Sequence, residues 1–80
     1  MSIIYHNEMD KADFLKLGYK IKYERSKQGL SQLDLSLKTG LTTRTISRIE
    51  CGTIDPKYST LVKIAEALGV NLSELLTFSL

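Results

Sequence analysis

Residues 31–52 read SQLDLSLKTGLTTRTISRIECG and contain the start and stop signals of two short helices. Ser31 begins a capping box, with an acidic residue three positions later. Gly40 ends the first helix, because a residue without Cβ readily takes the left-handed conformation that closes a helix. Thr42 is a candidate N-cap for a second helix over residues 43–51. Since the connection between the two helices is this short, we expect them to cross at a large angle.

Each of these helices has a predicted core face. Leu33 and Leu37, at i and i+4, are expected to point inward from the first helix. Rotation by about 100° per residue places four residues of the second helix on the core side: Thr42, Thr45, Ile46 and Ile49. The opposite side carries Thr43, Arg44, Ser47, Arg48 and Cys51.

The outward side of the second helix has the chemistry that reads a DNA major groove. Arg44 and Arg48 can make bidentate hydrogen bonds to guanine, and the short side chains of Thr43 and Ser47 let a helix approach base edges. The alternative is a solvated helix with two ordinary arginines. The tight turn before the helix favours DNA reading.

A longer helix is predicted before this pair. It starts at Asp10, stops at Gly29 and repeats its apolar residues at i, i+3 and i+7: Phe14, Leu17 and Ile21. Gly18 inside it costs about 1 kcal/mol relative to Ala or marks a close packing contact.

Two more helices follow a loop that contains the only proline, Pro56. The first has apolar residues at i, i+3, i+4 and i+7 from Leu61 and ends at Gly69, and its cap is either Asp55 with Pro56 at the first position or Ser59. The last opens with a capping box at Asn71. Ser2 to His6 is β-prone but too short for a sheet. The sequence therefore predicts an all-α fold with five helices.

Composition limits the class of protein. Eighty residues, 42% hydrophobic and 25% charged, fit one soluble domain. Cys51 is the only cysteine and His6 the only histidine, so we expect no internal disulfide and no structural metal. With no glycine-rich phosphate loop of the required spacing, we also expect no cofactor. The first ten residues lack the features of a signal peptide, and no apolar run is long enough to cross a membrane. A cytoplasmic protein is expected.

Positive charge is concentrated in one segment. The net charge is only +2, but residues 16–27 hold five basic side chains and one acidic one. This pattern fits contact with a polyanion or a solvated helix face.

Five short motifs follow one another along the chain, and they include its helix-ending glycines, a Ser-Gln helix start and a Ser-Arg-Ile-Glu string. They are Gly29-Leu30-Ser31-Gln32, Thr39-Gly40-Leu41-Thr42, Ile46-Ser47-Arg48-Ile49-Glu50-Cys51-Gly52, Pro56 and Ile64-Ala65-Glu66-Ala67-Leu68-Gly69-Val70. Over residues 17–77 the sequence closely resembles the Xre/Cro family of helix-turn-helix regulators, the class of the phage lambda repressor. The resemblance implies a compact five-helix, lambda-repressor-like DNA-binding domain over residues 11–80, after an N-terminal extension of residues 1–10. Its third helix is expected to dock in the major groove.

The resemblance also implies roles for single residues. The positions that read bases in the family fall on Thr43, Arg44 and Arg48, with Ser47 next in reach. The family's bracing and phosphate-contacting Gln falls on Gln32.

Other positions of the family concern the DNA backbone and the fold. Thr42 falls where a hydroxyl meets the DNA backbone, and Arg25 and Glu50 fall on a pair that the family joins by a salt bridge. Tyr58, near the loop, can donate to a phosphate. This chain departs from the family at Ser36, where Ala is usual and where we expect the hydroxyl to bond within its own turn. It also departs at Asp55, which puts a phosphate contact from that loop in doubt.

The leading hypothesis is a transcriptional regulator, not an enzyme, that binds double-stranded DNA as a homodimer at a near-palindromic operator. It would repress by occupying a promoter, with no room for an effector module. We expect Leu76, Phe78 and Leu80 in the dimer interface, because the last residues are more apolar than one short helix can bury. An antitoxin with a toxin partner and a restriction-modification controller are the alternatives. Cys51 is expected to be inert rather than a redox switch.

Overall fold

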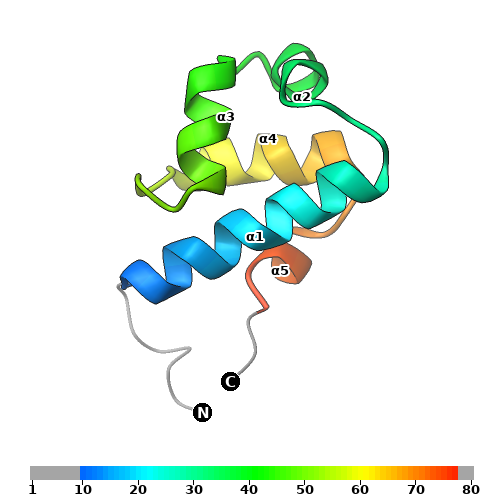
Figure 1. The fold of residues 1–80 in the computed structure, drawn as a ribbon. Helices are drawn as coiled ribbons and strands as arrows, with labels where there is room; N and C mark the ends of the chain where they lie inside the picture. The colour runs from blue at the N-terminus through cyan, green and yellow to red at the C-terminus, as the bar shows by residue number, and fades with distance from the viewer. Residues whose placement is uncertain (1–9, 78–80) are drawn as a thin grey trace.

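Five helices make up residues 10–77, the part of the chain that the computed structural model describes (Figure 1). In chain order they are α1 (Lys11–Lys27), α2 (Gln32–Thr39), α3 (Thr43–Glu50), α4 (Tyr58–Leu68) and α5 (Leu72–Leu75). This part of the chain contains no strand. The predicted all-α fold with five helices is confirmed. The β-prone run Ser2 to His6 lies outside the described residues.

Polar side chains start α1, α2 and α3 at the predicted residues. Asp10 and Ser31 both open capping boxes, and Ser31 Oγ accepts from the backbone N–H of Asp34 at 2.9 Å. In return Asp34 Oδ2 accepts from the N–H of Ser31 at 2.8 Å, and this hydrogen bond to the carboxylate lowers the pKa of Asp34. Thr42 Oγ1 accepts from the N–H of Thr45 at 3.1 Å. Each bond satisfies an amide that a first helical turn leaves without a partner.

The start of α4 differs from both predicted alternatives. The N-cap is Lys57, and no side chain hydrogen-bonds to the first turn of the helix. The caps predicted at Asp55 and at Ser59 are therefore wrong. Ile54, in the loop before the helix, is partly buried and packs against the core.

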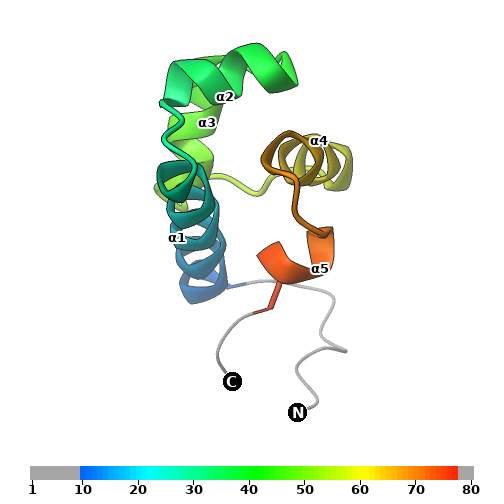
Figure 2. The same cartoon turned by 90° about the vertical axis from the view of Figure 1, so that its right-hand side faces the viewer.

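All five helices contribute to one core (Figure 2). Its buried side chains are Leu17, Ile21, Leu35, Ile46, Ile49, Leu61, Ile64, Ala65, Leu68 and Leu75. Leu72 is half-buried and packs against them. At about 25 cal/mol per Å² of apolar surface, burial of these residues is the main force that holds the helices together.

The predicted core face of α2 is wrong. Leu35 is fully buried, whereas Leu33 and Leu37 are 58% and 75% exposed. Residues two positions apart lie about 200° apart around a helix, so burying Leu35 turns its neighbours at ±2 outward. Contact with both α3 and α4 selects Leu35, which is information that the periodicity of α2 alone does not contain.

Two glycines help to position α3, one through its backbone conformation and the other through a close approach. Gly40 closes α2 with φ of +78°, and α2 and α3 then cross steeply, as predicted (Figure 2). At Gly18, α1 lies directly against the carboxyl end of α3. A Cβ there would sit 2.7 Å from the Ile49 carbonyl oxygen. Gly18 is therefore a close packing contact, the second of its two sequence interpretations.

Candidate nucleic-acid interface

The two faces of α3 separate as the sequence predicts, except that Thr42, predicted on the core side, is exposed, because it is the N-cap that precedes the helix. Ile46 and Ile49 are 0% and 2% exposed and anchor the helix in the core. The outward residues Thr43, Arg44, Arg48 and Cys51 are exposed, and Ser47 is half-buried. A helix fixed by its apolar side thus presents a continuous polar face to solvent.

Arg44 and Arg48 are four residues apart and therefore neighbours on this face. Both are exposed, and neither takes part in a salt bridge within the described part of the chain. Guanidinium groups in this state are open to an external acceptor. The planar guanidinium matches the paired acceptors of guanine or the oxygens of a phosphate.

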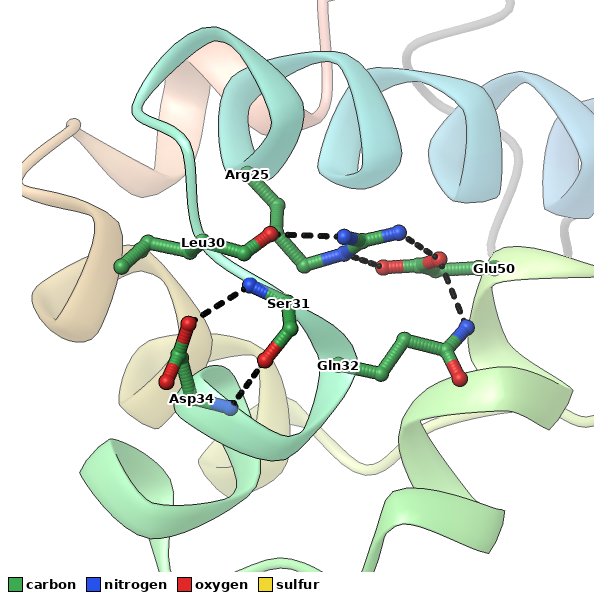
Figure 3. A network of polar contacts seen from close by, with 6 residues as sticks. All are labelled: Arg25, Leu30, Ser31, Gln32, Asp34 and Glu50. Atoms are coloured by element: carbon green, nitrogen blue, oxygen red, sulfur yellow. Dashed lines mark hydrogen bonds and ion pairs between the residues drawn. The ribbon is translucent and has the colours of Figure 1, made fainter.

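A salt bridge joins α1 to the last residue of α3 (Figure 3). Arg25 Nε lies 2.7 Å from Glu50 Oε2, and Arg25 Nη2 donates to Glu50 Oε1 at 2.9 Å. The two side chains are only 10% and 3% exposed. The third nitrogen, Arg25 Nη1, donates to the Leu30 carbonyl oxygen at 2.8 Å. The hydrogen bonds to Glu50 raise the pKa of Arg25, so this guanidinium stays charged.

Gln32 adds α2 to the same junction. Its Nε2 donates to Glu50 Oε1 at 3.1 Å, from the first residue of α2 (Figure 3). One carboxylate therefore holds side chains from α1 and α2 at the end of α3. Gln32 itself is half-buried.

Thr42 and Tyr58 occupy exposed helix starts. The Thr42 hydroxyl accepts from the N–H of Thr45 and donates to Thr45 Oγ1 at 3.0 Å. Tyr58 is the first residue of α4 and is 71% exposed. Asp55 is exposed in the loop before it.

Sequence reasoning missed the polar contacts in the turn between α2 and α3. Ser36 Oγ donates to the carbonyl oxygen of Leu41, beyond the end of α2. The expectation that this hydroxyl bonds within its own turn is wrong, because the chain reverses at Gly40 and brings Leu41 back toward it. Thr39 also contacts Leu41, accepting from its N–H at 3.2 Å. Hydroxyl residues near the end of a helix were the available signal.

At the other end of the molecule, Leu76 follows α5 and is 37% exposed. Leu75 is fully buried in the core. Phe78 and Leu80, the other residues expected in a dimer interface, lie outside the described residues. Within residues 10–77 no helix has the length and apolar composition needed to cross a membrane.

Two helices that cross after a three-residue turn, the second with a buried isoleucine pair and an exposed arginine pair, define a helix-turn-helix DNA-binding domain. The helix-turn-helix family matches residues 21–75, and the chain belongs to this family.

Curated relatives and solved structures agree with this assignment. An uncharacterized HTH-type transcriptional regulator of Methanocaldococcus jannaschii is 37% identical over 59 residues, which cover 74% of this chain and 89% of the relative. The HTH-type transcriptional regulator PuuR of Escherichia coli is 40% identical over 57 residues, 71% of this chain but 31% of PuuR. The restriction-modification controller protein C.AhdI of Aeromonas hydrophila superposes with a TM-score of 0.78 at 31% identity, covering 80% of this chain and 97% of C.AhdI. The protein is thus similar to transcriptional regulators of different lengths that share this domain.

Proposed function

We propose that this protein is a sequence-specific transcriptional regulator that reads its operator with the exposed face of α3. The observation that carries the proposal is the pair Arg44 and Arg48, exposed and free of salt bridges in the described chain, on a helix anchored by Ile46 and Ile49. Arginine bidentate to guanine is the commonest specific contact in the major groove. The protein acts by binding DNA, not as an enzyme.

The roles divide between bases and backbone. Arg44 and Arg48 contact guanines, while Thr43 and Ser47 have short side chains that reach base edges at close range. Gln32, Thr42 and Tyr58 contact phosphates and fix the register of the domain on the duplex. For Thr42 this requires its hydroxyl proton, which now points to Thr45 Oγ1, to turn toward the phosphate.

The protein binds a near-palindromic operator as a homodimer. Leu76 is exposed beside the buried end of α5, and the chain continues with two more apolar residues, Phe78 and Leu80. A small domain gains stability when a symmetry mate covers such a patch. Two α3 helices then enter successive major grooves about 10 base pairs apart.

Repression by occupying a promoter is the simplest mode of action. Control of a restriction-modification operon is a second candidate, because C.AhdI, a restriction-modification controller, matches this chain over 97% of its own length. An adjacent restriction-modification gene pair supports that role. A neighbouring toxin gene, or a small basic partner that co-purifies, supports the antitoxin alternative.

Selection of binding sites from random double-stranded DNA tests the proposal. We expect enrichment of a site with two inverted half-sites, each with guanines, whose centres lie about one helical turn apart. Recovery of unrelated sequences after repeated rounds, with equal affinity for all of them, contradicts sequence-specific regulation.

A further inference from the structure

Two side chains of α2 hold the turn between α2 and α3 at a single residue, Leu41. Ser36 Oγ donates to the Leu41 carbonyl oxygen, and Thr39 Oγ1 accepts from the Leu41 N–H at 3.2 Å. Thr39 Oγ1 also donates to the carbonyl oxygen of Leu35 at 2.7 Å. Both backbone polar groups of Leu41 are thus bound by hydroxyls, and we call this pair of contacts the hydroxyl clasp.

The clasp acts on a residue that is also anchored by its side chain. Leu41 is half-buried and packs against the core. Gly40 before it donates its N–H to the Ser36 carbonyl oxygen at 2.8 Å, and Thr42 after it is the N-cap of α3. The backbone dihedral angles of these three residues set the direction of α3 relative to α2. The clasp restricts Leu41 at its N–H and its C=O, and packing against the core restricts its side chain.

A turn without the clasp keeps fewer constraints. The apolar contact of Leu41 and the glycine that closes α2 remain, but the carbonyl and N–H of Leu41 lose their intramolecular partners and compete for water. We expect the turn then to have more conformational freedom and the amino-terminal end of α3 to vary more in direction. Base contacts need placement within about 0.5 Å and 10–20°, whereas binding to a scrambled duplex is mainly electrostatic attraction to phosphates, which depends less on an exact helix direction.

We infer that Ser36 and Thr39 are positioning residues for operator recognition, which hold α3 in the direction that lets its arginines reach base edges. The inference rests on the proposed function, since it concerns how that reading surface is presented. Neither side chain needs to touch DNA. The clasp lowers the entropic cost of binding because the recognition helix is already oriented in the free protein.

The test uses matched variants of the full chain. Ser36→Ala removes one hydroxyl and Thr39→Val removes the other with little change of shape, while Thr39→Ser keeps the hydroxyl. Ser26→Ala, at an exposed position of α1, is the control for loss of a serine hydroxyl elsewhere. Dissociation constants are measured for the selected operator and for a scrambled duplex, at a temperature where circular dichroism shows every variant folded.

We expect the operator dissociation constant to rise about threefold in each of Ser36→Ala and Thr39→Val and about tenfold in the double variant, the scale set by loss of one or two hydrogen bonds. Affinity for the scrambled duplex should change by less than about twofold, and Thr39→Ser and Ser26→Ala should bind both duplexes like the wild type. Amide exchange at Leu41 should be faster in Thr39→Val than in Thr39→Ser.

Two results overturn the inference. One is unchanged operator affinity in the double variant, and the other is an equal loss of affinity for operator and scrambled duplex, as a general weakening of the fold would produce. A wild-type protein that does not distinguish the two duplexes contradicts the proposed function itself. That result is separate from either of the outcomes that refute the clasp alone.

Discussion

Glu50 is the residue on which the placement of α3 depends most. Its carboxylate accepts two hydrogen bonds from Arg25 and one from Gln32, and its side chain is 3% exposed. Such a pair is weak evidence of net stability, but removal of one partner leaves the other buried without compensation, which costs about 3–5 kcal/mol. Glu50 therefore ties the carboxyl end of α3 to α1 and to the first residue of α2.

A double-mutant cycle tests this junction. Arg25→Ala and Glu50→Ala should each lower the free energy of unfolding by about 3–5 kcal/mol, and the double variant by clearly less than the sum. Urea unfolding followed by circular dichroism supplies the three differences. A coupling energy of zero shows that the two side chains do not stabilise each other.

At Gly18 we expect a change to Ala to destabilise the protein, although helix propensity alone predicts that it stabilises the helix. Ala is favoured over Gly by about 1 kcal/mol in an exposed helix interior, but a Cβ here would lie 2.7 Å from the carbonyl carbon of Glu50 and from the carbonyl oxygen of Ile49. Overpacking of this kind costs about 1–3 kcal/mol, and backbone atoms cannot move aside as a side chain can. Gly18→Ala should therefore lower the melting temperature, while Ser26→Ala on the exposed side of α1 should leave it nearly unchanged. A higher melting temperature for Gly18→Ala would show that α1 and α3 are not in close contact.

Among the elements, α2 shows what packing adds to a sequence pattern. Leu35→Ala should destabilise the protein by about 2–5 kcal/mol because the side chain is fully buried. Leu33→Lys and Leu37→Lys should change the free energy of unfolding by less than about 0.5 kcal/mol, since both residues are mostly exposed. The same urea titration measures all three variants. A large loss of stability in Leu33→Lys with a small loss in Leu35→Ala would instead support Leu33 and Leu37 as the buried face of this helix.

The reasons that some elements are predictable from sequence are local. Ser31, Thr42 and Gly40 act through their own backbone neighbours, so three helix boundaries follow from short-range chemistry. The face that α2 buries and the start of α4 depend instead on the elements that each helix packs against. No pattern within either segment contains that information. The hydroxyl clasp escaped prediction for the same reason, because Ser36 and Leu41 meet only after the chain has turned.

The candidate site was predictable to a similar extent. The exposed face of α3 followed from its periodicity, since its two isoleucines leave only one direction for Arg44 and Arg48. The roles of Arg25, Gln32 and Glu50 came from resemblance to a family, and the structure places Arg25 and Gln32 each within hydrogen-bonding distance of Glu50. The DNA contacts of Gln32 and of the other residues assigned to bases or phosphates remain predictions.

At the scale of the whole molecule, the proposal requires two copies. Leu76→Asp should convert the proposed dimer to a monomer, because a charge would replace apolar contact in the proposed interface. Sedimentation velocity without DNA, on the wild type and the variant at the same concentrations, measures the difference. A wild type that remains monomeric at high micromolar concentration contradicts the assignment of this end of the chain as the dimer interface.

The central claim is that α3 reads bases through Arg44 and Arg48, and it is tested most directly by the affinity of each arginine variant for the selected operator and for a scrambled duplex at two salt concentrations. Arg44→Ala and Arg48→Ala should each cost about 1–3 kcal/mol on the operator and far less on the scrambled duplex. Tyr58→Phe, which removes a proposed phosphate contact, should lower the affinity for both duplexes by about the same factor. If either arginine variant instead loses the same factor on both duplexes, with a reduced salt dependence, that arginine binds phosphate and the proposed base contact is wrong.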